Sequence, residues 1–126
     1  MNKEIINSAL APAPIGPYNQ AVKVGNLLFV SGQIAIDQAS GNLIQESIEI
    51  ETEQVMKNLS YILAEAGSDF SKVVKTSIFI NDMNNFAKIN EVYATYMSEP
   101  YPARETVEVS KLPKNVNVEI SVIALI

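Results

Sequence analysis

The chain has 126 residues, of which 48% are hydrophobic, and a formal net charge of −5 at pH 7. This length is close to the commonest size of one domain, and so much apolar material can form a core without disulfides or metal. The chain contains no histidine and no cysteine, which excludes Ser-His-Asp catalysis, a thiol nucleophile and the usual zinc ligands. Acid–base chemistry near neutral pH must therefore use Asp, Glu, Tyr, Lys or ordered water.

Charge and hydropathy also limit the partners and the location. The acidic balance and the absence of a Lys/Arg cluster disfavour a nucleic-acid surface. No apolar run approaches the roughly 18 residues that cross a membrane, and the N-terminus lacks the apolar core of a signal peptide. We expect one domain over residues 1–126, located in the cytoplasm and not in a membrane.

The first part of the chain predicts a loop followed by a hairpin. Prolines and Gly16 make residues 12–17 irregular. The apolar segments 22–24 and 27–30 flank Gly25-Asn26, a pair that tolerates positive φ, which predicts a hairpin. Residues 31–33 are expected to break the second strand, and Gly32 indicates a bulge or a close backbone approach.

Two helices are predicted further along. The first begins near Ser47, a favoured N-cap residue, and ends at Gly67, which suits the residue after a helix. The second follows Asp82 or Asn84 and stops before Pro100. Its apolar stripe consists of Phe86, Ile89, Tyr93, Tyr96 and Met97.

β-Branched residues predict further strands over 73–80, 105–109 and 116–125. The order β-β-α-β-α-β-β is typical of a two-layer α+β fold in which both helices cover one sheet. Residues 73–109 should form a βαβ unit, with parallel strands joined by a right-handed crossover.

The apolar residues of each strand should face the helices together, because a one-residue slip would expose the whole set. This apolar set consists of Val107, Val109, Val116, Val118, Ile120, Val122 and Ala124. The alternating polar residues are then expected on the helix-free face: Arg104, Thr106, Asn117, Glu119 and Ser121.

The helix-free face is also expected to be partly apolar. Strand 73–80 has apolar residues on both sides, and Ile123 and Leu125 add to this face. An exposed apolar patch usually marks an interface, and its burial is worth about 25 cal/mol per Å². We therefore expect copies of the chain to associate through this face, with Arg104 and Glu119 near the boundary.

Arg104 and Glu119 are the candidates for chemistry. The planar guanidinium suits a carboxylate, although a structural salt bridge from Arg104 to Glu105 or Glu108 is an alternative. Glu119 lies among apolar neighbours, where desolvation would raise its pKa and let it exchange a proton with water. The alternative interpretation of Glu119 is an exposed charge on a half-polar strand face.

Four other residues have a functional and a plain interpretation. Tyr18, on a constrained loop, either walls a pocket or packs as a rim aromatic. Ser31 and Gly32 either bring backbone groups to a ligand or form a simple bulge, and Asn90 is a ligand contact or a solvated helical amide. The sequence has neither a Gly-rich phosphate loop nor a cluster of metal ligands.

Over nearly its whole length the chain resembles the YjgF/RidA family of reactive intermediate deaminases. Each matching segment is weak alone, but their order and spacing are specific. The segments are Ile15-Gly16-Pro17-Tyr18, Ser31-Gly32-Gln33, Val74-Lys75-Thr76, Asn90 to Tyr93, Pro102-Ala103-Arg104, Val107-Glu108-Val109, Leu112-Pro113 and Val118-Glu119-Ile120.

This resemblance implies a chorismate-mutase-like fold, with a mixed sheet of about six strands and two helices on one face. It also implies a homotrimer with sites at the subunit interfaces. The implied reaction is hydrolysis of 2-aminoacrylate/2-iminopropanoate and 2-iminobutanoate to 2-keto acids and ammonia, without cofactor or metal.

The resemblance implies a role for each matching residue. Arg104 holds the substrate carboxylate and Glu119 orients or activates water. The remaining substrate-binding positions are Tyr18, Ser31, Gly32, Asn90 and Thr106.

Two positions depart from the family pattern and leave substrate preference open. Thr106 stands where Cys is common, and Ser121 replaces an acidic residue that many members carry. One alternative function is a non-catalytic trimer that binds 2-keto acids or other metabolites. Another is the RNA-cleaving or translation-inhibiting activity linked to some relatives, against which the acidic balance and the absent histidine argue.

Overall fold

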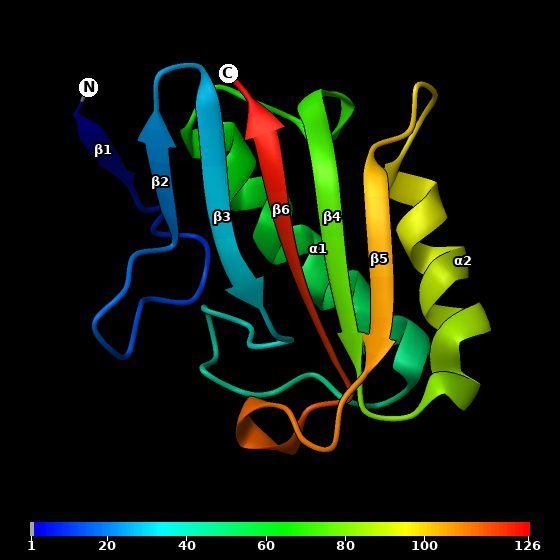
Figure 1. The fold of residues 1–126 in the computed structure, drawn as a ribbon. Helices are drawn as coiled ribbons and strands as arrows, with labels where there is room; N and C mark the ends of the chain where they lie inside the picture. The colour runs from blue at the N-terminus through cyan, green and yellow to red at the C-terminus, as the bar shows by residue number, and fades with distance from the viewer. Residues whose placement is uncertain (1) are drawn as a thin grey trace.

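The structure, a computed structural model that describes residues 2–126, is a six-stranded mixed sheet with two α-helices packed on one face (Figure 1). This confirms the predicted two-layer α+β architecture. The helices are α1 (Ile48–Glu65) and α2 (Phe86–Tyr96). The strands, in the sheet order β1-β2-β3-β6-β4-β5, are β1 (Lys3–Ile6), β2 (Ala21–Val24), β3 (Leu27–Gln33), β6 (Val118–Leu125), β4 (Val73–Ile80) and β5 (Ala103–Glu108).

Both ends of α1 are where the sequence predicts them. The Ser47 hydroxyl oxygen accepts a hydrogen bond from the Ile50 N–H at 3.1 Å, which satisfies one of the free N–H groups of the first turn. Gly67 follows the helix with φ +76°, a conformation that costs glycine little. The apolar face of α1, including Val55, Leu59 and Ile62, is fully buried against the sheet.

The segment from β4 to β5 is the predicted βαβ unit, because these two strands pair in parallel. The carboxylate of Asp82 accepts the N–H of Asn84 at 3.0 Å, but it caps a 3-10 turn over Met83–Asn85. The α-helix itself therefore begins later, at Phe86.

The N-terminal half differs from expectation at two strands. β1 pairs with β2 at the edge of the sheet and was not predicted, because its four residues carry no clear alternation. β3 continues to Gln33 instead of breaking at residues 31–33. Its ladder with β6 is irregular between Val30 and Gln33, the stretch in which Gly32 predicted a bulge or a close backbone approach.

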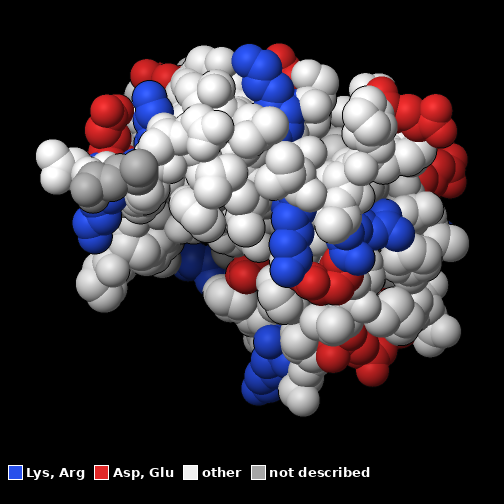
Figure 2. Space-filling model, turned by 45° about the horizontal axis from the view of Figure 1, so that its top comes forward, with Lys and Arg blue, Asp and Glu red and all other residues white. Residues whose placement is uncertain are grey.

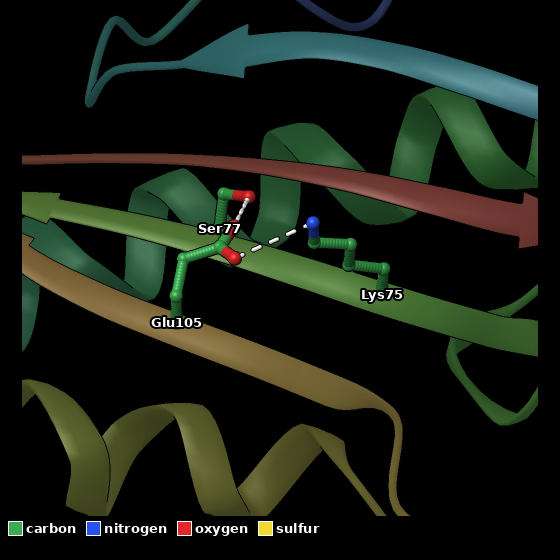
Figure 3. Close-up of polar contacts among 3 residues, drawn as sticks. All are labelled: Lys75, Ser77 and Glu105. Carbon is green, nitrogen blue, oxygen red and sulfur yellow. Dashed lines mark hydrogen bonds and ion pairs between the residues drawn. The ribbon is translucent and has the colours of Figure 1, made fainter.

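The predicted orientation of β5 is wrong. Arg104 and Thr106 lie opposite Thr76 and Ile78 of β4, whose side chains are fully buried beneath the helices. Residues paired across a parallel ladder point to the same face, so Arg104 and Thr106 face the helix side. Glu105, between them, points the other way and contacts Lys75 and Ser77 on the helix-free face (Figure 3).

The error arose from taking Val107 as a core residue. Val107 pairs with Phe79 on the helix-free face and is 41% exposed, so it belongs to the surface patch and not to the core. β5 is also an edge strand. Its helix-side positions meet the rim of the core beside α2, where polar residues are tolerated.

In β6 the predicted faces are correct for the strand itself. Val118, Ile120 and Val122 are buried under the helices, and Glu119 and Ser121 alternate with them on the helix-free face. Asn117, which precedes the strand, was placed wrongly. Its amide Nδ2 and its backbone N–H donate to the buried carboxylate of Glu51 in α1, at 2.7 and 2.9 Å.

The helix-free face retains exposed apolar side chains, as predicted. Phe29, Val107 and Leu125 are each 40% exposed or more. Within residues 2–126, neither helix has the length and apolar character that crossing a membrane would require.

Candidate active site

Arg104 and Asn90 lie in a hollow between α2 and the start of β5. The hollow has a volume of about 440 Å³ and is lined by Asn90, Tyr93, Ala94, Met97, Tyr101, Pro102 and Arg104. The helix contributes one wall, and the turn that contains Tyr101 and Pro102 contributes the other. We refer to it as the arginine hollow.

Asn90 and two aromatic rings hold the Arg104 guanidinium. Its Nη1 donates to Asn90 Oδ1 at 2.7 Å, and its Cζ lies 5.2 Å from the Tyr93 ring centroid and 5.6 Å from that of Phe86. A cation over an aromatic face gains about 0.5–2 kcal/mol, and the flat guanidinium suits this stacking.

The predicted salt-bridge alternative for Arg104 is not what the structure contains. Among residues 2–126 the ion pair within 4.0 Å joins Glu105 to Lys75, at 3.3 Å, and not to Arg104. A guanidinium carries five N–H donors, so donors beyond the one given to Asn90 remain for a carboxylate.

Glu119 lies in a second hollow, on the helix-free face, which we call the glutamate hollow. Its volume is about 400 Å³. Four predicted site residues line it together: Tyr18, Ser31, Gly32 and Glu119. Its other walls are Pro12, Ala13, Ile15, Ile34, Ile36, Pro113 and Lys114.

The carboxylate of Glu119 rests directly against the backbone of Gly32. A Cβ built on Gly32 would lie only 2.6 Å from Glu119 Oε2, so a side chain at position 32 would displace the carboxylate. Burial raises the pKa of Glu119, the direction predicted for a desolvated carboxylate. An acid with a raised pKa, open to a hollow, is suited to take up and return a proton.

The loop that carries Tyr18 is held by Ser31 and by Gln20, which was not predicted as a site residue. The Ser31 hydroxyl donates to the Asn19 carbonyl at 2.6 Å. Gln20 is buried, and its amide Nε2 donates to the carbonyls of Ser8, Ala11 and Pro12. An isolated Gln just before an apolar strand gives little sequence signal, although it fixes one wall of the glutamate hollow.

The two hollows open on different sides of the sheet, so the predicted residues divide into two groups. Arg104 and Asn90 are on the helix side, and Tyr18, Ser31, Gly32 and Glu119 are on the other. Thr106 is on the helix side, where its buried Oγ1 has no hydrogen-bond partner among residues 2–126. In the same range, no group of three or more acidic side chains is placed to hold a metal ion.

The sequence and the α+β fold have clear counterparts among known proteins. The family model described as Endoribonuclease L-PSP matches residues 8–126. A RutC family protein of Pyrococcus abyssi is 50% identical over 98% of both chains. The mouse 2-iminobutanoate/2-iminopropanoate deaminase is 44% identical over 98% of this chain and 91% of that protein.

A solved structure agrees with these sequence relatives. The crystal structure of Escherichia coli TdcF with bound serine is 36% identical to this chain, covers 98% of both chains and superposes with a TM-score of 0.92. The chain therefore belongs to the Endoribonuclease L-PSP family, which is the YjgF/RidA family indicated by its motifs.

A side chain at position 32 should disturb Glu119. We expect Gly32→Ala to push the Glu119 carboxylate away from the strand, because the added methyl group overlaps it and the end of this flexible side chain can move. The pKa of Glu119 should then fall back toward that of an ordinary glutamate, because the carboxylate becomes less buried. NMR titration of the Glu119 carboxyl carbon measures this. Gly16→Ala is the matched control, since its Cβ would meet the Tyr18 ring at an ordinary 3.6 Å. Equal effects of the two substitutions would contradict the close contact at Gly32.

The raised pKa of Glu119 predicts a pH-dependent stability. The folded protein keeps the Glu119 proton to higher pH than the unfolded chain does. The contribution of this proton to the free energy of unfolding is therefore fully present below the unfolded pKa of about 4.3. This contribution is lost as the pH rises through the folded pKa. The unfolding free energy of the wild type minus that of Glu119→Gln should therefore fall from about pH 4 to pH 7. A difference that stays level or rises would show that Glu119 is not desolvated.

Proposed function

We propose that this protein hydrolyses 2-aminoacrylate/2-iminopropanoate and 2-iminobutanoate to 2-keto acids and ammonia. The observation that carries the proposal is a pair of complementary half-sites. One presents a guanidinium with free donors, and the other presents a carboxylate whose pKa is raised by burial. The name of the mouse relative, a 2-iminobutanoate/2-iminopropanoate deaminase, supports the same chemistry.

The division of the residues between two faces indicates a site shared by two chains. Arg104 and Glu119 of one chain are separated by the sheet, so we infer that the arginine hollow of one subunit meets the glutamate hollow of its neighbour. A contact between two different surfaces forms a closed ring when the rotation that relates the subunits closes, and a homotrimer is such a ring. The exposed apolar side chains of the helix-free face would supply buried area.

In this site Arg104 binds the substrate carboxylate. Two parallel N–H···O bonds fix both the position and the plane of the acid. After the enamine tautomerises to the imine, its electrophilic carbon is held at a defined distance from Glu119 of the neighbouring subunit. Arg104 thus contributes proximity and orientation, while the bond changes occur elsewhere.

Glu119 carries the proton transfers. Its carboxylate takes a proton from water as the water oxygen bonds to the imine carbon, and it passes this proton to the nitrogen, which becomes an amine. Glu119 then takes the proton of the new hydroxyl group and gives it to the amine nitrogen while the C=O bond forms and the C–N bond breaks, so that ammonia leaves with a 2-keto acid and the carboxylate is restored. A raised pKa suits a group that must act first as base and then as acid.

The polar residues of the two hollows complete the binding site. Asn90 steadies Arg104, and the backbone near Gly32 faces the reacting region. Tyr18 and the apolar walls surround the small side chain of the substrate. The backbone of Thr106 is proposed to hold the substrate nitrogen. No cofactor takes part in the proposed steps.

Two other functions are distinguished by chemistry. Ribonuclease activity, named in the family description, is disfavoured by the net charge of −5 and by the absence of histidine. Figure 2 agrees, since basic and acidic side chains are interspersed on the face it shows. A non-catalytic 2-keto acid binder would need Arg104 but not the acid–base role of Glu119.

Removal of the acid should abolish turnover. With enzymatically generated 2-aminoacrylate, Glu119→Gln should release ammonia at least about 100-fold more slowly, because the amide cannot exchange the proton. Glu65→Gln, an exposed change at the end of α1, serves as the control. An unaltered rate in Glu119→Gln would refute the catalytic role and leave the binding protein as the explanation.

Mixed subunits test whether the site is shared. Neither Arg104→Ala nor Glu119→Gln should be active alone. If each site takes Arg104 from one chain and Glu119 from the next, an equal mixture that has exchanged subunits should regain about a quarter of wild-type activity. No recovery in verified mixed oligomers would exclude a shared site.

A further inference from the structure

We propose that a hydrogen bond between Tyr93 and Thr76 positions Arg104 for its ligand. Neither residue is among the predicted site residues, and the inference rests on the proposed role of Arg104 in binding a carboxylate. Tyr93 lines the arginine hollow, and Thr76 lies beneath it in β4. Both act through Arg104 and are therefore positioning residues.

Thr76, Arg104 and Tyr93 each contact the other two residues of this group. Thr76 is paired with Arg104 across the β4–β5 ladder, so their backbones are fixed side by side. The Tyr93 hydroxyl donates to Thr76 Oγ1 at 3.0 Å, and the Tyr93 ring lies 5.2 Å from the Arg104 guanidinium carbon. The ring that supports the guanidinium is thus tied to the strand residue that neighbours the arginine.

Burial makes this tie specific. Thr76 is fully buried and Tyr93 is 6% exposed, so water cannot readily replace either partner. The Arg104 side chain is exposed and would otherwise sample many rotamers. Asn90 fixes one nitrogen of the guanidinium, and the tied ring fixes its plane. The two constraints together pre-align the remaining donors with an incoming carboxylate.

The alternative is that the bond only holds α2 on the sheet. Tyr93→Phe and Thr76→Val remove the hydrogen bond and keep the size of the side chains. A purely structural bond would then lower thermal stability and leave substrate binding unchanged. A positioning bond would raise KM, because loss of alignment weakens carboxylate binding before and during the reaction.

The rate of ammonia release at increasing concentrations of 2-iminobutanoate gives both KM and kcat. We expect Tyr93→Phe and Thr76→Val each to raise KM about 3- to 10-fold with kcat within about twofold. The double variant should be no worse than either single variant, since both remove the same bond. Tyr96→Phe is the matched control, because this α2 hydroxyl bonds to Glu53 and not to Thr76. It should leave KM unchanged.

Unchanged KM in both single variants, an effect confined to kcat, or additive effects in the double variant would each overturn the proposal. If the wild type releases no ammonia, the proposed function fails. NMR relaxation of the Arg104 Nε–H then tests separately whether the Tyr93–Thr76 hydrogen bond restrains the guanidinium. Greater guanidinium mobility in Tyr93→Phe than in Tyr96→Phe would support it. Equal mobility would overturn it.

Discussion

The parallel pairing of β5 with β4 is the constraint on which the rest of the site depends. It sets Arg104 opposite a fully buried threonine, and so turns the guanidinium toward α2, where an amide and two aromatic rings receive it. The same alternation sends Glu105 to the other face, beside Lys75. A shift of one residue would exchange these two side chains and leave the arginine hollow without its cation.

A second constraint acts on the opposite face. The irregular stretch of β3 brings the backbone of Gly32 against Glu119, and the absence of a Cβ leaves space for the carboxylate. The buried amide of Gln20 donates to three backbone carbonyls of the neighbouring loop and so holds that loop in place. The acid is therefore half-buried among rigid neighbours instead of projecting into water, which is the physical origin of its raised pKa.

Local patterns predicted most of the fold, and their failures have physical reasons. Some features depend only on residues that are close in the sequence, so they can be predicted from it. These are the helix cap at Ser47, the glycine at position 67 and the apolar stripes of the helices. Which side chains of β5 point toward the helices depends on the position of this strand at the edge of the sheet. Val107 is exposed there, although an apolar residue in a strand is expected to lie in the core. The pairing of Tyr93 with Thr76 joins residues from different elements, which no periodicity reveals.

The placement of Arg104 and Glu119 on opposite sides of one sheet has a thermodynamic consequence for the proposed assembly. A ligand that touches both groups bridges two chains, so it binds the associated form and not the separated one. Mass action then requires the ligand to strengthen the association and the association to strengthen ligand binding by the same factor. Dilution of the protein would weaken its affinity for small acids without altering any residue.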